Sequence, residues 1–216
     1  MAGKKTLTAP RQRHPRGEGA LLRDELLDAA VALLHEKGHE DRVSINAVVA
    51  RVGVTPPALY THFADKADLF REVHARGMAD FGQFIEERVG KIRSPMKQLR
   101  ARGLAYLEYA FAHPDSYRSL FMSPCSPDAT APDLPIRMLG NACFSGLLRN
   151  VERCQRDGSL PIATKDIDRT ARGLWAIVHG CASIALAMPS GFDPYGANEM
   201  VKHVTDGFLT GLGARE

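Results

Sequence analysis

The amino-acid sequence predicts an all-α protein with about nine helices. Apolar residues recur at three- and four-residue steps in successive segments, and this period is typical of one face of a helix. No segment shows a convincing alternation of apolar and polar residues, which a half-buried strand would require. Glycine or proline follows most of the periodic segments, and both residues commonly end helices. With 44% hydrophobic residues in 216, the chain has enough apolar side chains for a substantial core.

Composition and periodicity divide the chain into three regions. Residues 1–19 lack helical periodicity and place five lysines and arginines before the first acidic residue, so we expect a disordered basic arm. Residues 20–66 are expected to form a small three-helix domain, and residues 67–216 a larger helical domain. The formal net charge of +3 is too small to prove nucleic-acid binding by itself. The arm can contact DNA or remain solvated, and the sequence leaves both possibilities open.

An apolar stripe that stops at Gly38 predicts the first helix. Its members fall at i, i+4, i+7, i+8, i+11 and i+12: Leu22, Leu26, Ala29, Ala30, Leu33 and Leu34. A short second helix follows, with Ser44 suited to its N-cap and Gly53 to the tight turn at its end. Thr55 is suited to cap a third helix, which is expected to extend from Pro57 to His62.

Two short helices joined by a glycine turn are typical of the helix-turn-helix, whose second helix enters the major groove of DNA. The string GVTPPALYTHFADK, from Gly53 to Lys66, resembles the recognition-helix sequence of TetR/AcrR-type transcriptional regulators. The resemblance covers about residues 21–70 of the chain. It implies a homodimer that binds double-stranded operator DNA, with Leu59 and Phe63 in the core of the DNA-binding domain. A palindromic operator, repression and release by a small molecule complete this hypothesis.

Short side chains of the third helix are the candidates for contact with base edges, because they let the backbone approach the groove. They are Thr55, Pro57, Ala58 and Thr61. Tyr60, His62 and Lys66 are candidates for phosphate contacts, and the resemblance assigns Tyr60 and Lys66 to the DNA backbone. Ser44 can add one phosphate bond, and the N-terminus of the next helix is itself an anion site. Pro57 departs from the small or basic residue usual in this family and lacks a possible N–H donor.

The remaining helices follow from further apolar stripes. Asp65 is suited to cap a long helix that ends at about Val89, before Gly90. After Ser94-Pro95 come a helix that stops at His113, a short helix from Asp115 to Met122, a proline-rich loop over residues 123–135, a helix from Ile136 that Gly158 closes, a helix from about Lys165 to Met188 and a last helix from Asn198 to Leu212.

Trp175, His179 and Gly180 form a W-x-x-x-H-G sequence within the most apolar helix. This spacing resembles the C-terminal ligand domain, named WHG for these letters, of some TetR-type regulators. The resemblance implies a pocket for a small-molecule effector whose chemical class the sequence leaves open. Candidates for its wall are Tyr106, Tyr109, Met138, Phe144, Trp175 and His179. The resemblance also implies that the last two helices form the dimer interface, where small residues permit close contact.

Residues 35–39 read H-E-x-x-H, the pattern of zinc proteases. That chemistry needs both imidazoles on one face of a continuous helix, whereas Gly38 is expected to end the helix before His39. We therefore interpret His35 and His39 as solvated residues near a helix C-terminus. The sequence contains no Gly-rich phosphate loop, nucleophile elbow or catalytic carboxylate pair. We expect no enzymatic activity, no catalytic residue, no metal and no cofactor.

The chain has neither a run of about 18 apolar residues nor an apolar secretion signal, so we expect a cytoplasmic protein without a membrane partner. Its four cysteines lack C-x-x-C spacing and are expected to be reduced thiols. Three alternatives stay open: an activator or dual regulator, a ligand-independent architectural DNA-binding protein, and a metal-dependent hydrolase that uses His35, Glu36 and His39.

Overall fold

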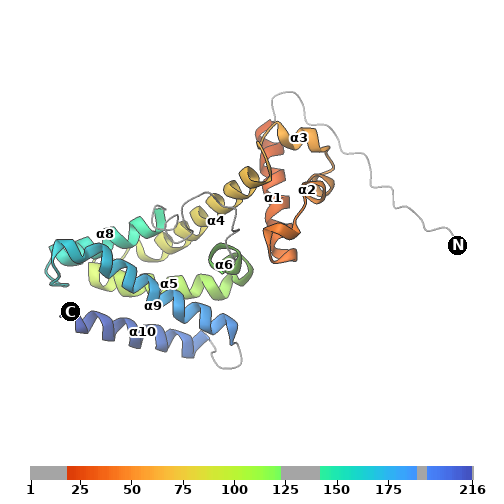
Figure 1. Ribbon diagram of the computed structural model, residues 1–216. Coiled ribbons are helices and arrows are strands. Elements are labelled where there is room, and N and C mark those ends of the chain that lie inside the picture. Colours follow the sequence, from red (N-terminus) through yellow and green to blue (C-terminus); the bar gives the residue numbers. More distant parts are fainter. Residues whose placement is uncertain (1–18, 123–141, 189–193, 216) are drawn as a thin grey trace. The chain divides into compact units, whose positions relative to one another are not determined.

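The computed structural model describes residues 19–122, 142–188 and 194–215, which form nine α-helices and two short 3-10 helices (Figure 1). These described residues contain no β-strand, and the prediction of an all-α protein is confirmed. Most of the expected basic arm, the proline-rich loop over residues 123–135 and Met138 lie outside the described residues. The chain divides into two compact units between Val73 and His74.

The first unit contains three helices and the beginning of a fourth. These are α1 (Gly19–Lys37), α2 (Ile45–Val52), α3 (Pro56–Tyr60) and the first turns of α4 (Lys66–Val89). Its core consists of apolar residues from all four helices and the turns between them: Leu26, Leu27, Ala29, Ala30, Leu33, Leu34, Val43, Val48, Val49, Leu59, Phe63, Leu69, Phe70 and Val73. The sequence placed the domain boundary after Lys66, but Leu69, Phe70 and Val73 belong to this core. The first unit therefore extends two turns into α4.

Two glycines end helices of the first unit as the sequence predicts. Gly38 has φ +74° and Gly53 has φ +77°, which is the left-handed conformation that glycine adopts without a steric penalty. The Gly38 amide donates to the carbonyl of Leu34 at 2.8 Å. At the start of α2, the Ser44 hydroxyl accepts a hydrogen bond from the Ala47 amide at 3.1 Å, and this confirms its N-cap position.

Helix α3 begins one residue earlier and ends two residues earlier than the sequence predicts. Thr55 occupies the N-cap position, but its hydroxyl makes no capping hydrogen bond. The reason is local: Pro56 and Pro57 have no N–H to donate, and the Ala58 amide donates to the Thr55 carbonyl at 3.0 Å. After Tyr60 the chain closes the helix with a turn in which the His62 amide donates to the Leu59 carbonyl.

Helix α4 has a reciprocal cap of two aspartates at its N-terminus. The Asp65 carboxylate accepts a hydrogen bond from the Asp68 amide at 2.7 Å, which confirms the predicted cap. The Asp68 carboxylate accepts one from the Ala64 amide at 2.9 Å, and this bond lowers the pKa of Asp68. Two backbone donors near this helix end are thereby satisfied within the protein, which reduces the expected anion site there.

The second unit contains the rest of α4 and five further helices. These are α5 (Pro95–Ala112), α6 (Pro114–Phe121), α8 (Ala142–Arg156), α9 (Ile167–Ala187) and α10 (Pro194–Gly211). Figure 1 shows α5, α8, α9 and α10 side by side. Helices α5 and α9 each contact the other three helices of this group. Helix α10 starts four residues before the predicted Asn198, because Pro194 is tolerated in a first helical turn. None of the helices within the described ranges is both long and apolar enough to cross a membrane.

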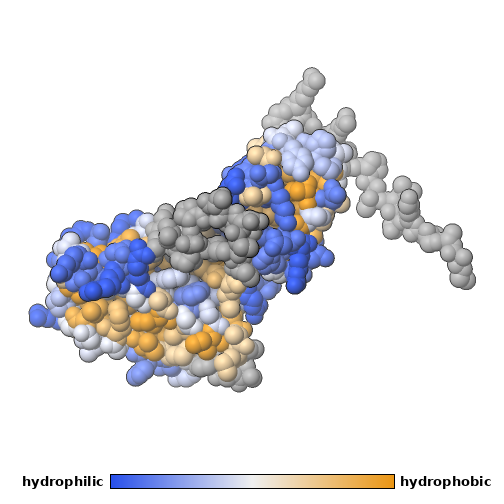
Figure 2. Space-filling view, in the orientation of Figure 1, coloured by the Kyte–Doolittle hydropathy of each residue, from blue (hydrophilic) through white to orange (hydrophobic). Residues whose placement is uncertain are grey.

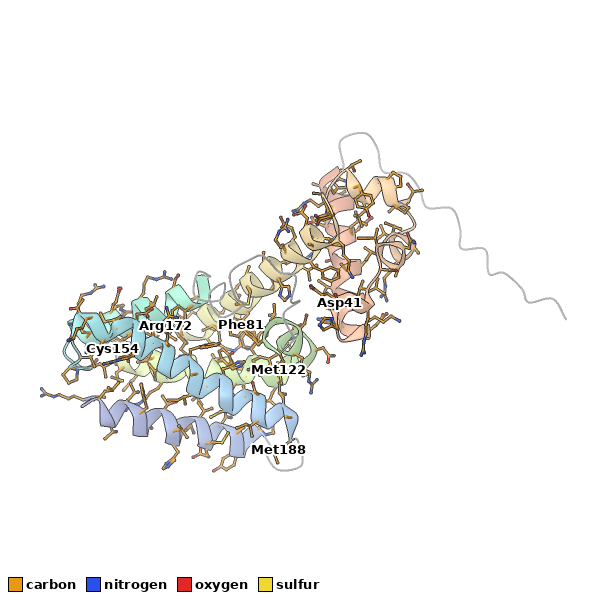
Figure 3. The ribbon with its side chains drawn as sticks, viewed as in Figure 1. Asp41, Phe81, Met122, Cys154, Arg172 and Met188 are labelled. Carbon is orange, nitrogen blue, oxygen red and sulfur yellow. The ribbon has the colours of Figure 1, made fainter. Side chains whose placement is uncertain are left out.

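Two apolar clusters hold the second unit together. One joins α4, α5, α6, α9 and α10 around residues such as Phe81 and Tyr117. The other joins α5, α8, α9 and α10 around residues such as Cys154 and Leu209. Trp175 packs against both clusters. Phe81 and Cys154, labelled in Figure 3, mark the two clusters. The helical stripes predicted from the sequence thus meet in two adjoining cores.

Candidate functional site

Helix α3 exposes most of the side chains that were predicted to contact DNA. Thr55, Pro57, Tyr60 and Thr61 are exposed, and Tyr60 retains 51% of its surface. Ala58, His62 and Lys66 are half-buried. Leu59 and Phe63 are fully buried and attach the helix to the core of the first unit. The helix therefore presents a polar surface on a rigid base, as a nucleic-acid contact requires.

Some basic side chains of the first unit form an ion pair with a carboxylate, and Lys66 does not within the described residues. Arg51 lies 2.7 Å from Glu36, and Arg71 lies 2.7 Å from Asp68. Lys66 forms no ion pair with any described residue, and its Nζ lies 5.7 Å from the centre of the Phe70 ring. A cation held over an aromatic ring and without a carboxylate partner keeps its charge for an external anion. Lys66 is thus electrostatically suited to a phosphate.

Three hydroxyl groups in and around α3 differ in the hydrogen bonds that they can still make. The Thr61 hydroxyl donates to the Ala58 carbonyl at 2.7 Å, so its proton is used within the helix and its lone pairs remain. The Thr55 hydroxyl makes no capping bond and retains both functions. The Ser44 hydroxyl accepts from the Ala47 amide and can still donate its proton.

The H-E-x-x-H segment lacks the geometry of a zinc site. Helix α1 ends at Lys37, and His39 is extended with φ −152° and ψ 141°. Its imidazole caps the following 3-10 helix, Glu40–Arg42, and lies 3.3 Å from the Asp41 carboxylate. Glu36 is held by Arg51 in an ion pair that lowers the pKa of this carboxyl. Among the residues the structure describes, no group of three potential ligands could hold a metal ion.

In the second unit, His179 of α9 is the centre of a hydroxyl cluster. Its Nδ1 lies 3.1 Å from the Tyr106 hydroxyl of α5 and 2.9 Å from the Tyr117 hydroxyl of α6. Tyr117 also lies 3.4 Å from the Ser183 hydroxyl and from the His179 carbonyl. The shortest contact open to the Tyr117 proton is therefore Nδ1. Donation along it favours the imidazole tautomer with its proton on Nε2.

The indole of Trp175 covers one side of this cluster. It stacks on the His179 ring with 5.2 Å between centroids and 18° between planes. Burial lowers the pKa of His179, because the charged imidazolium loses hydration. Burial also raises the pKa of Tyr117. The cluster is thus neutral at physiological pH and combines aromatic surface with a few polar atoms, which is the composition of a small-molecule site.

The other predicted wall residues are distributed around this cluster. The ring centroids of Tyr109 and Phe81 are 4.8 Å apart, and those of Phe81 and Tyr106 are 5.1 Å apart. Phe144 of α8 lies in the second apolar cluster, with the Arg172 guanidinium 5.9 Å from its ring. Met138 lies outside the described residues. The structure brings Tyr106 and Trp175 each into direct contact with His179, whereas Tyr109 contacts Phe81 and Phe144 lies in the second apolar cluster.

Comparison with known protein families assigns both units. Residues 26–73 match the model of bacterial regulatory proteins of the TetR family, and residues 99–208 match the tetracyclin repressor-like C-terminal domain. The chain belongs to the TetR family. The first match covers the whole helix-turn-helix, and the second includes the W-x-x-x-H-G sequence. The TetR-type resemblance is confirmed, and both matched domains are those of DNA-binding transcriptional regulators rather than of an enzyme.

Similar proteins agree with this TetR-family assignment. The chain is 31% identical over 108 residues to an uncharacterized HTH-type transcriptional regulator of Mycobacterium tuberculosis, covering 50% of this chain and 49% of that protein. It is 32% identical over 89 residues to the HTH-type transcriptional regulator AcrR of Shigella flexneri, covering 41% of each. The chain thus spans about half the length or less of these curated relatives.

Solved structures extend the similarity of this TetR-family fold to nearly the whole chain. A Rhodococcus protein of unknown function superposes with a TM-score of 0.73 at 24% identity, covering 96% of this chain and 100% of that one. A TetR-like transcriptional regulator from Rhodococcus superposes with a TM-score of 0.60 at 22% identity, covering 94% and 100%. At these identities, the structural similarity establishes the fold alone.

Two members of the second-unit site were missing from the predicted wall of this TetR-family protein. Tyr117 is fully buried and contacts His179, and Ser183 lies one turn after His179 on α9. The sequence did carry a signal for Tyr117, because it follows the His113-Pro114 pair that resembles the same C-terminal domain. Ser183 had no such signal apart from its spacing of four residues from His179.

We expect the stability of this TetR-family protein to fall as the pH drops below about 6.5. The unfolded chain protonates His179 near that pH, whereas burial in the folded state lowers the pKa and keeps the ring neutral. The unfolded state then binds more protons, and the free energy of unfolding decreases with falling pH. His179→Gln should reduce this decline. The measurement is the free energy of unfolding, obtained from urea titrations at a series of pH values between about 7 and 5.

Proposed function

We propose that the protein is a homodimeric repressor that binds a palindromic operator and dissociates from it when a small-molecule effector binds the second unit. The observation that carries the proposal is the surface of α3. It exposes Thr55, Tyr60 and Thr61 while Leu59 and Phe63 fix the helix in the core. A short helix with a buried base and polar exposed residues is suited to enter the major groove.

The DNA contacts follow from the side chains of α3 and its neighbours. The Thr61 hydroxyl donates its hydrogen bond to the Ala58 carbonyl, so its free lone pairs can accept a hydrogen bond from an adenine or cytosine amino group. Pro57 and Ala58 offer apolar contact with a thymine methyl group. Tyr60 and Lys66 contact phosphates, because Tyr60 is exposed and Lys66 lacks a carboxylate partner within the described residues. Other predicted contacts are Thr55 to a base, with His62 and Ser44 to phosphates.

The dimer forms through α9 and α10. Figure 2 shows hydrophobic residues gathered over these two helices. Large apolar side chains there keep much of their surface exposed: Ile184 47%, Met188 56%, Tyr195 74% and Val204 40%. At Gly180, Gly207 and Gly211 an added Cβ would meet no atom within 4 Å, so a second copy can approach closely. Such an apolar surface favours an isologous contact, in which the same face of both copies is buried.

Effector binding at the His179 cluster changes DNA affinity through α4. This helix contributes Leu69 and Phe70 to the core of the first unit and Phe81 to the cluster around Tyr106. An effector that favours one arrangement of α4 shifts the population of DNA-competent dimers. DNA binding by two recognition helices requires a separation of about 34–36 Å, so a modest movement is sufficient for release.

The experiment that tests this function is selection of bound DNA from a random pool by the purified protein at a stated salt concentration. We expect enrichment of a palindrome by the natural protein and no enrichment by a Tyr60→Ala/Lys66→Ala variant. Transcription in vitro from the selected site then distinguishes repression from activation. Absence of any enriched palindrome, or enrichment that the variant retains, would contradict the proposal and favour non-specific DNA binding.

A further inference from the structure

Arg102 of α5 is a buried cation with incomplete hydrogen bonding. The residue exposes only 7% of its surface. Its Nη1 lies 2.9 Å from Oε1 of Glu86 on α4, at the distance of an ion pair. Even so, neither Nη1 nor Nε has a partner in hydrogen-bonding geometry among the described residues. The carboxylate thus lies near the guanidinium without accepting a well-directed N–H.

The incomplete hydrogen bonding of Arg102 is unfavourable for the free energy of folding. A buried charge is normally paired and fully hydrogen-bonded, because a donor that loses water without gaining a partner is destabilising. Glu86 does not supply a complete partnership, since 49% of its side chain is exposed to solvent. The fork of N–H donors on an arginine is matched by the two oxygens of a carboxylate that approaches in its plane. Within the part of the chain that the structure describes, the Glu86 carboxylate is close to the guanidinium of Arg102 but does not give it this two-oxygen contact.

The helix opposite Arg102 packs closely against the ion pair. Gly146 of α8 lies so close that an added Cβ would be 2.7 Å from the Glu86 Oε1 and 3.1 Å from the Arg102 Nη1. Any larger residue at position 146 would displace the ion pair. The absence of a side chain on α8 is thus a condition for placing Arg102 and Glu86 between α4, α5 and α8.

The aromatic cluster begins one helical turn further along α5. Tyr106 follows Arg102 at i+4 and reaches His179, on which Trp175 stacks. Phe81 of α4 lies against Tyr106 at 5.1 Å, and Glu86 follows Phe81 on the same helix. Arg102 thus adjoins an aromatic surface that contains few polar atoms. A molecule with one charged end and an apolar body could therefore contact the guanidinium with its charged end and the aromatic cluster with its apolar part.

We propose that the effector is a small apolar carboxylate, whose carboxylate binds the Arg102 guanidinium while its apolar part packs against Tyr106 and Trp175. Glu86 is the counter-ion of Arg102 in the free protein, and it moves to solvent when the effector carboxylate replaces it. This inference rests on the proposed function in one respect, namely that the His179 cluster is the effector site. It adds the charge and chemical class of the effector and the residue that selects it.

The test compares carboxylates with their neutral amides as ligands of the full-length protein. The probes are decanoate with decanamide, and naphthoate with naphthamide, each at about five times the Kd of the better ligand. We expect the carboxylate of at least one pair to raise the melting temperature by about 3 °C more than its amide. Arg102→Met should abolish this difference. The control Arg100→Met, which removes a half-buried arginine of the same helix that pairs with Asp206 at 2.8 Å, should retain it.

A second variant keeps the test decisive if Arg102→Met does not fold. Glu86→Gln removes the competing counter-ion and is expected to strengthen carboxylate binding severalfold in calorimetric titration, with the amides unaffected. The proposal is overturned if neither carboxylate is preferred over its amide, if Arg102→Met keeps the preference, or if Glu86→Gln leaves carboxylate affinity unchanged. Release of operator DNA by neutral compounds alone would reject the carboxylate proposal and leave the regulatory function standing. Carboxylate binding that depends on Arg102, without any DNA binding, would support the carboxylate proposal and reject the regulatory function.

Discussion

Replacement of both Tyr60 and Lys66 by alanine is expected to weaken operator binding by about 100-fold or more. Each residue is assigned one hydrogen bond to a charged phosphate, and such bonds contribute about 1.5–3 kcal/mol each. Loss of the Lys66 charge should also reduce the slope of log K against log salt by about 0.9 for each half-site. Fluorescence anisotropy with the selected operator at several salt concentrations measures both quantities.

Two further variants separate phosphate contacts from base contacts. Lys97→Ala removes an exposed lysine of the second unit and should leave both affinity and salt slope unchanged. Thr61→Ala should keep the salt slope but alter which bases are preferred, because it removes an acceptor rather than a charge. If the Tyr60 and Lys66 double variant binds the operator as tightly as the natural protein, α3 is not the reading helix in the orientation described.

Ile184→Glu is expected to dissociate the dimer and reduce operator affinity by at least about 100-fold, since a monomer contacts only one half-site. Ile184 lies on the exposed apolar face of α9 and retains 47% of its surface. Within a dimer, the new carboxylates would be buried next to their symmetry mates without partners, which is strongly unfavourable. Sedimentation velocity at micromolar concentration measures the molar mass, and anisotropy measures the loss of DNA binding.

The matched control is Met122→Glu at the end of α6, where a methionine retains 41% of its surface. Figure 3 labels this residue and Met188, which belongs to the α9 and α10 face. The control introduces the same charge at a similarly exposed apolar position outside the proposed interface. It should sediment as a dimer and bind DNA normally. A dimeric Ile184→Glu protein would place the interface elsewhere.

The helix boundaries that could be predicted are those decided by local chemistry. Gly38 and Gly53 end their helices because the left-handed conformation is accessible to glycine at no steric cost, and this property is visible in the sequence. Ser44 and Asp65 cap helices through hydrogen bonds that span three residues. The bounds of α3 were wrong by one residue at the start and by two at the end, where a turn from Leu59 to His62 closes the helix.

The parts of the site that could not be predicted depend on contacts between distant segments. Tyr106 and His179 were both candidates for the pocket wall, but their hydrogen bond joins residues 73 apart in sequence, and the one from Tyr117 to His179 joins residues 62 apart. Their meeting depends on how α5, α6 and α9 pack, which periodicity does not specify. Arg102 is the clearest case, since arginine is mostly found at exposed positions. Only the fold reveals that it is buried beside Glu86 and Gly146.

The stacking of Trp175 on His179 makes the intrinsic tryptophan fluorescence sensitive to the state of His179. The chain contains one tryptophan, so all indole fluorescence originates from this stack. An imidazolium quenches a neighbouring indole more strongly than a neutral imidazole does, and separation of the two rings removes the contact altogether. Emission intensity therefore follows the protonation and displacement of His179 without any attached dye. Stopped-flow recording of the same signal would give the rate at which a ligand reaches the ring, independently of any measurement on DNA.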